Sequence, residues 1–152
     1  MEKSSVGKKL SEFNSIIRES DDIYRCAAKL SGLSDCAFWI LYTLRADGEA
    51  VTQSEICSII YQPKQTVNSA LKKLEQDGIL QLTEMTDRRS KQLSLTDKGR
   101  RLAEQTVDRV IAAEQKALSG LTDKEQEAFL QLFHKYTDFL KTAMSALRQQ
   151  DF

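Results

Sequence analysis

The only proline of the 152-residue chain, Pro63, constrains the fold more than any other single residue. Proline disfavours helical geometry at the residue before it and suits the first turn of a new helix. The preceding segment opens with the capping box Thr52-Gln53-Ser54-Glu55, so a short helix begins there and stops near Tyr61. Pro63 to Gln76 then forms a second helix, and Asp77-Gly78 places a glycine for a left-handed cap. The sequence therefore predicts two short helices joined by a tight turn.

A short β-hairpin is predicted directly after these helices. Residues 79–85 have the composition of a strand, and residues 92–95 alternate polar and apolar side chains as a half-buried strand does. The connecting residues 86–91 are polar and rich in positive charge. Glu49-Ala50-Val51 is a candidate for a further, very short strand. Helix, tight turn, helix and basic hairpin is the order of a winged helix-turn-helix, whose second helix enters the DNA major groove.

Longer helices flank this segment. Apolar residues recur at separations of three and four from Leu10 to Leu30, and residues 34–46 are apolar on nearly all sides, as in a central helix. After the hairpin we expect one helix from Thr96-Asp97 to about Leu118, and a last helix that opens with the capping box Thr122-Asp123-Lys124-Glu125. The predicted fold class is mainly α with a small β-hairpin, a winged helix-turn-helix lobe plus long N- and C-terminal dimerisation helices.

The lengths of the outer helices predict a partner chain. Residues 8–30 and 122–148 would span about 35 and about 40 Å, as long as or longer than a compact core of this size is wide. Part of their apolar faces must then be covered by a second copy, unless both helices fold back on their own domain. We expect a single domain over residues 1–152, with the winged lobe at 34–100 and a helical dimerisation region at 8–30 and 102–148.

Charge is concentrated in the middle of the chain. The 22 basic and 22 acidic residues cancel, so a uniformly basic surface is absent, but residues 61–101 carry an excess of lysine and arginine. On the helix after Pro63, Val67 and Leu71 share one face, and polar groups able to bind base edges or phosphates lie opposite. A solvated helix face is the alternative interpretation. The DNA-binding residues predicted on this helix are Gln62, Lys64, Gln65, Thr66, Asn68, Ser69, Lys72 and Lys73.

The segment Asp87-Arg88-Arg89-Ser90-Lys91-Gln92-Leu93-Ser94-Leu95-Thr96-Asp97-Lys98-Gly99 resembles the wing signature of the MarR (multiple antibiotic resistance regulator) family. Residues 65–78 are similar to the recognition helix of that family, and nearly the whole chain fits its layout. The resemblance implies that Arg89 enters the minor groove while Asp87 fixes its guanidinium, and that the terminal helices form a homodimer. Many members carry a basic residue near Ser69, and this chain does not. The predicted wing contacts are Asp87, Arg88, Arg89, Ser90 and Lys91.

Other site chemistries are less well supported. His134 is the only histidine and no nucleophile motif accompanies it, so we predict neither an enzyme nor a cofactor or metal site. Some relatives sense oxidants through a cysteine, which makes Cys26, Cys36 and Cys57 candidates, although buried apolar packing explains them better. Others bind small aromatic ligands, and a cleft for one is predicted from Tyr24, Phe38, Trp39 and Tyr42, which also suit an ordinary core.

Taken together, the sequence predicts a cytoplasmic, homodimeric, sequence-specific DNA-binding transcriptional regulator. We expect it to repress from a pseudo-palindromic operator in double-stranded DNA and to be released by a small aromatic ligand or another signal. No apolar run is long enough for export or membrane insertion, so no membrane partner is expected. Two alternatives stay open: a winged-helix module that docks a protein, and a redox-sensing regulator that acts through a cysteine.

Overall fold

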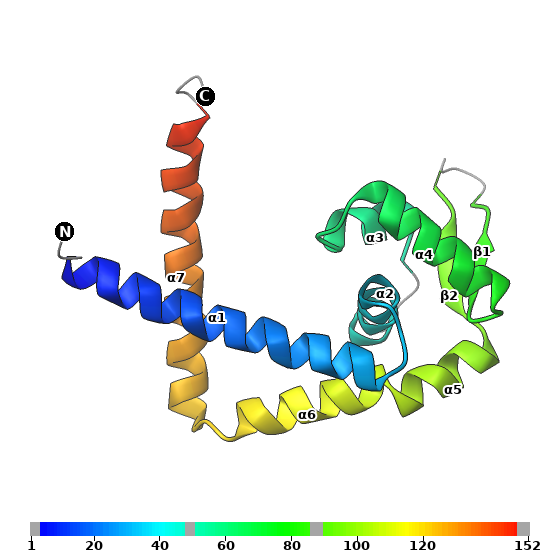
Figure 1. Ribbon diagram of the computed structural model, residues 1–152, viewed down its shortest axis with the longest axis horizontal. Coiled ribbons are helices and arrows are strands. Elements are labelled where there is room, and N and C mark those ends of the chain that lie inside the picture. Colours follow the sequence, from blue (N-terminus) through cyan, green and yellow to red (C-terminus); the bar gives the residue numbers. More distant parts are fainter. Residues whose placement is uncertain (1–3, 48–50, 86–89, 149–152) are drawn as a thin grey trace. The chain divides into compact units, whose positions relative to one another are not determined.

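The structure is a computed structural model that describes residues 4–47, 51–85 and 90–148. Its helices and strands follow in the order shown in Figure 1. They are α1 (Ser5–Leu30), α2 (Asp35–Ala46), α3 (Gln53–Ile59), α4 (Lys64–Gln76), β1 (Leu80–Thr83), β2 (Gln92–Leu95), α5 (Asp97–Gln105), α6 (Val107–Ser119) and α7 (Asp123–Leu147). The chain divides into two compact units, residues 1–111 and 112–152, which are described separately. The predicted fold class, mainly α with a small β-hairpin and a winged helix-turn-helix, is confirmed.

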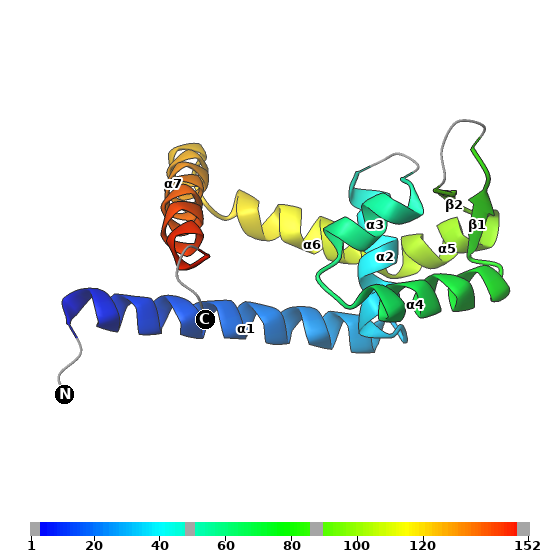
Figure 2. The same cartoon turned by 90° about the horizontal axis from the view of Figure 1, so that it is seen from above.

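Helix α2 is the centre of the first unit, as its apolar sequence predicts. Phe38, Ile40 and Leu41 are fully buried. Helices α1, α4 and α5 each contact α2, and both views of the lobe show α2 enclosed between them (Figures 1 and 2). The strands add Leu80 and Leu93 to the same core. The helix-turn-helix and the hairpin are therefore positioned by one continuous apolar cluster.

The two short helices begin and end where the sequence predicts, with one shift at the proline. Thr52 Oγ1 accepts a hydrogen bond from the Glu55 backbone N–H, and the Glu55 carboxylate accepts one from the Thr52 backbone N–H at 2.7 Å, so the capping box is confirmed. Pro63 is the N-cap of α4, one residue ahead of the helix rather than within its first turn. Gly78, at φ 71°, provides the left-handed conformation that ends α4.

The hairpin pairs β1 and β2 antiparallel, with Leu82 opposite Leu93. Strand β1 is shorter than the predicted 79–85. An isolated antiparallel β-bridge joins the residue before α3 to β2, because Thr52 pairs with Gln92. Beside it, the Val51 carbonyl accepts a hydrogen bond from the Leu93 N–H at 2.7 Å. Of the short strand predicted at Glu49-Ala50-Val51, only Val51 lies within the described part of the chain, and it is not a strand residue; the bridge forms one residue later, at Thr52.

One predicted helix proves to be two. Instead of a single helix over residues 97–118, α5 and α6 are separated at Thr106, whose φ and ψ are −124° and −91°. The Thr106 hydroxyl donates to the Leu102 carbonyl at 2.6 Å, the kind of local side-chain bond that competes with regular helix. Val107 is fully buried and continues the apolar periodicity across the break. Periodicity alone therefore could not reveal it.

An ion pair ties the start of α6 to the lobe. Arg45, at the end of α2, donates from Nε to Asp108 Oδ1 at 2.8 Å and from Nη2 to Asp108 Oδ2. This bidentate contact is partly buried and joins residues 63 positions apart. Bidentate geometry fixes direction as well as distance. The first turn of α6 is therefore held against α2 immediately after the break at Thr106.

Gly99 allows α5 to approach the hairpin closely, and we expect Gly99→Ala to destabilise the fold. A Cβ at this position would lie 2.1 Å from the Ile79 carbonyl oxygen, which itself accepts from the Thr96 N–H. Relieving that overlap requires the backbone to shift, so the free energy of unfolding should fall by about 1 to 3 kcal/mol. Urea denaturation at fixed protein concentration measures the change. Gly120→Ala, whose added methyl would lie 3.1 Å from its nearest atom, is the control; equal losses in the two variants would contradict the prediction.

The second unit consists of the end of α6 and helix α7. Its predicted capping box is confirmed, because Thr122 and Glu125 exchange hydrogen bonds between side chain and backbone. These bonds lower the pKa of the Glu125 carboxyl below its ordinary value. Not one described residue of α7 is buried, although the helix carries a regular series of apolar side chains. None of the helices within the described ranges combines the length and apolarity needed to cross a bilayer.

Candidate nucleic-acid interface

The outward face of α4 is polar. The helix is amphipathic because Val67, Leu71 and Leu74 turn into the core. The opposite side has a shallow hollow, and α4 lies between α3 and the hairpin in the lobe (Figure 1). The hollow is lined by five of the eight residues predicted on this helix: Lys64, Gln65, Asn68, Ser69 and Lys72. These five residues form the outer face of α4.

The other three predicted residues have different surroundings. Thr66 and Lys73 are exposed on α4 but do not line the hollow. Gln62, in the turn before α4, donates from its amide to the Asp35 carboxylate at 3.0 Å. Asp35 is the first residue of α2, so this bond fastens the turn to the central helix. Gln62 therefore has a structural contact in addition to its predicted role.

The outer face is electropositive. Helix α4 has three lysines and a single acidic residue, Glu75, which is in its last turn. Among the described residues, no ion pair involves Lys64, Lys72 or Lys73. Exposed, unpaired ammonium groups beside amide and hydroxyl side chains can hold phosphates while the neutral groups contact base edges. The arrangement suits a double-stranded nucleic acid.

Two of the five predicted wing residues lie within the described part of the chain, and both join the hairpin to α3. The Ser90 hydroxyl accepts from the Ser54 backbone N–H at 3.0 Å and is hydrogen-bonded to the Ser54 hydroxyl at 2.9 Å. The Lys91 carbonyl accepts from the Gln53 N–H at 2.8 Å, and the Lys91 side chain is exposed. The returning side of the hairpin is therefore anchored to the first turn of α3. Asp87, Arg88 and Arg89 lie outside the described residues.

Asn68 differs from the rest of the outer face because its side chain is tied to α3. Gln53 Nε2 donates to Asn68 Oδ1 at 3.1 Å, and the Cys57 thiol lies 3.7 Å from the same oxygen. Neither Gln53 nor Cys57 was predicted from the sequence to belong to the interface. They are 15 and 11 residues from Asn68, and no local pattern links positions so far apart.

The four aromatic residues predicted to line a cleft are packed together across α1 and α2. The Trp39 ring lies 5.2 Å from that of Tyr24, 5.1 Å from that of Phe38 and 5.2 Å from that of Tyr42. Phe38 is fully buried, while the other three are partly exposed. The cluster is continuous with the core and has polar hydroxyl and indole groups at its edge.

The three cysteines have distinct environments. Cys36 is buried, and its burial, followed by the negative charges of Asp35 and Cys57, raises the pKa of its thiol. Raising that pKa reduces the thiolate form that oxidants attack. Cys57 is half-buried against Asn68, and Cys26 is exposed on α1. His134 is exposed on α7, and within the described ranges no three potential metal ligands lie together.

Comparison with known sequences gives two matches that bear on this site. A model of the MarR family matches residues 31–90, which include all of α2, α3, α4 and β1. The uncharacterised HTH-type transcriptional regulator YwoH of Bacillus subtilis is 31% identical over 105 residues. That alignment spans 69% of this chain and 76% of YwoH.

Comparison with solved structures shows the same fold over most of the chain. NMB1585, a MarR family regulator from Neisseria meningitidis, superimposes with a TM-score of 0.76 and 24% identity, covering 91% of this chain and 97% of its own. MepR of S. aureus in complex with DNA gives a TM-score of 0.65 and 22% identity, covering 91% of this chain and 99% of MepR. The fold of a winged helix-turn-helix with long flanking helices is therefore shared with these proteins.

Proposed function

Because the chain belongs to the MarR family of DNA-binding transcriptional regulators, we propose that it is a homodimeric repressor that recognises a pseudo-palindromic operator. In this proposal α4 enters the major groove through its outer face, and the hairpin residues 87–91 contact the neighbouring minor groove and backbone. The observation that carries the proposal is the outer face itself, where two lysines without an ion-pair partner among the described residues flank amide and hydroxyl groups. The related fold of MepR has been solved with DNA bound.

Exposed apolar side chains support the dimer. Leu132 and Phe139, seven residues apart on one side of α7, are 65% and 66% exposed in the single chain. Leu30, at the end of α1, is 90% exposed. Large apolar patches on a protein surface are typical of interfaces with another chain. A twofold dimer covers both copies of each patch and offers two outer faces to half-sites about 34 to 36 Å apart.

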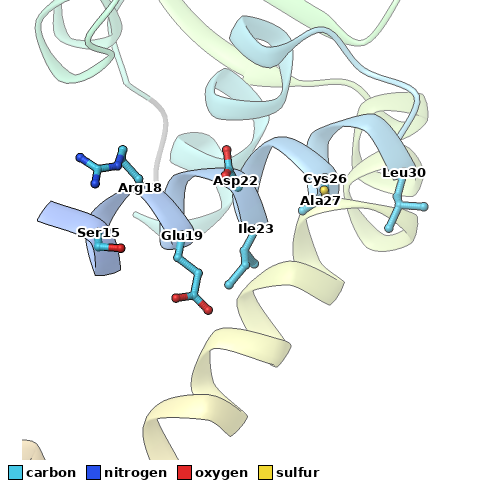
Figure 3. Close-up of a pocket in the computed structure, with 8 residues that line it drawn as sticks. All are labelled: Ser15, Arg18, Glu19, Asp22, Ile23, Cys26, Ala27 and Leu30. Atoms are coloured by element: carbon cyan, nitrogen blue, oxygen red, sulfur yellow. The ribbon is translucent and has the colours of Figure 1, made fainter. Parts of the chain in front are cut away.

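The face of α1 that the proposed dimer covers also carries Cys26. Ile23, Cys26 and Leu30 line a hollow along this helix together with polar residues, and Figure 3 shows their side chains on the same stretch of α1. Covering Ile23 and Leu30 by a second chain would shield the neighbouring thiol from solvent. We therefore favour ligand release over a cysteine switch at this position.

We propose that a small aromatic ligand releases the repressor by binding at the ring cluster of Tyr24, Trp39 and Tyr42. Trp39 is the only tryptophan in the chain, so its fluorescence reports on that cluster directly. A substituted phenol that lowers operator affinity is expected to change Trp39 emission with the same midpoint concentration. A phenol that releases DNA while leaving the emission unchanged would place the ligand elsewhere.

The proposed function is tested by selecting bound duplexes from a random pool with the full chain. The expected product is an inverted repeat with its half-sites about 10 base pairs apart. The same selection with Gln65→Ala is expected to lose preference at one base step in each half-site. Recovery of no enriched sequence, or of a single unrepeated half-site, would contradict the proposal.

A further inference from the structure

The carboxamide oxygen of Asn68 is fully engaged within the protein. An amide oxygen has two lone pairs. One accepts the Gln53 side-chain amide at 3.1 Å, and the other faces the Cys57 thiol at 3.7 Å. Both partners belong to α3, behind the outer face. Asn68 also lines the hollow beside Gln65 and Ser69, so the part of its amide left for a ligand is the NH₂ group.

We propose that Gln53 is a specificity-determining positioning residue, which holds Asn68 so that it offers DNA hydrogen-bond donors only. This inference rests on the proposed function and goes beyond it by naming the base preference. An asparagine that pairs bidentately with adenine must accept from N6–H as well as donate to N7. The Asn68 oxygen has no lone pair left for that bond. Guanine, whose major-groove edge displays the two acceptors N7 and O6, is the base that a donor-only amide favours.

Gln53 is well placed for this role because its own backbone is fixed. Its N–H donates to the Lys91 carbonyl at 2.8 Å, so the residue that holds Asn68 is bonded to the hairpin directly before β2. The neighbouring Ser54 adds two contacts to Ser90. The outer face and the hairpin are thus connected through one residue. A residue whose backbone and side chain are both hydrogen-bonded loses little further freedom on binding, which favours discrimination between bases.

The first test changes Gln53 while leaving Asn68 in place. The base pair that Asn68 recognises is identified as the operator position at which the Asn68→Ala variant no longer prefers one base. At that pair the full-length wild type is expected to favour guanine over adenine about tenfold. Gln53→Met keeps the length of the side chain but cannot donate, so the Asn68 amide can rotate and the preference should fall to about twofold or less. Gln105→Met, the same substitution at an exposed position of α5, is the control and should keep the wild-type preference.

The second test reverses the hydrogen bond. In Gln53→Glu the carboxylate can only accept, so it should draw the Asn68 NH₂ inward and turn the amide oxygen towards DNA. The preference at the same pair is then expected to move towards bases that display an amino group, adenine or cytosine. Each variant is compared by the ratio of Kd values on duplexes that differ at this pair alone. A ratio is insensitive to a uniform loss of affinity, including the repulsion that the added charge causes.

The results of these tests distinguish a failure of the Gln53 inference from a failure of the proposed function. Failure of the wild type to select any sequence would overturn the proposed function. If the wild type selects an operator but favours adenine at the Asn68-dependent pair, or if Gln53→Met leaves that preference unchanged, the role of Gln53 is overturned alone. An Asn68→Ala variant without any altered base preference would overturn it as well. If the inference is right, adding Gln53→Met to the Asn68→Ala variant causes no further change in base preference.

Discussion

Replacing Leu132 and Phe139 of α7 together by glutamate is expected to convert the dimer to monomers and to weaken operator binding by more than about 100-fold. Both side chains are about two-thirds exposed in the single chain, so the substitution leaves the core of the lobe intact. In the dimer it would bury carboxylates in an apolar interface, at a cost of several kcal/mol each. Separated subunits lose the advantage of binding two half-sites at once. Sedimentation velocity and operator titration measure the two effects.

Gln131→Glu is the control for the position of the added charge, with one carboxylate per chain where the variant has two. Gln131 precedes Leu132 directly, is exposed, and lies about 100° away from it around the helix. It adds a negative charge to the same turn of α7 without entering the apolar face. This control should sediment as a dimer with unchanged operator affinity. A Leu132→Glu/Phe139→Glu protein that still sediments as a dimer would show that α7 is not the principal contact between subunits.

Removing two lysines from the outer face is expected to reduce operator affinity at least about 100-fold near 0.1 M salt. Lys64 and Lys72 line the hollow, and no ion pair among the described residues neutralises either of them. In a dimer the variant Lys64→Ala/Lys72→Ala loses four positive charges. If each one holds a phosphate, the slope of log K against log salt becomes shallower by about 3 to 4. The loss should be similar for operator and unrelated duplexes, because phosphates are the same in both.

The control for the lysine variant removes equal charge from elsewhere. Lys124→Ala/Lys141→Ala changes two exposed lysines of α7 and should leave the salt slope within about 1 of the wild type. A shallower slope in the control, matching that of Lys64→Ala/Lys72→Ala, would indicate that overall charge rather than the outer face governs binding.

Much of the fold was predictable because it is encoded by neighbouring residues. The capping boxes at Thr52 and Thr122 specify helix starts within four residues, and the glycine at position 78 marks a helix end. The break at Thr106 was not predictable in the same way. The apolar pattern runs across it without a change of phase, and the ion pair from Arg45 that holds the second segment comes from 63 residues away.

The candidate site likewise has features that neighbouring residues encode and features that depend on residues far apart in the sequence. The outer face followed from the periodicity of α4, because burying Val67 and Leu71 on one side exposes lysines and amides on the other. The sequence also predicted a role in base recognition for Asn68. The partner of that side chain could not be foreseen, since a glutamine at the start of a different helix has no sequence signature of orienting an amide. The sequence therefore predicted which residues face outward, and the structure adds how one of them is oriented.

The central claim is that two copies of this chain present their outer faces to one operator. The most direct measurement is the mass of the complex formed with the selected duplex, by native mass spectrometry at low protein concentration. The expected result is two chains on one duplex, with the complex lost in Leu132→Glu/Phe139→Glu. A stable, sequence-specific complex of one chain with one duplex would contradict the claim.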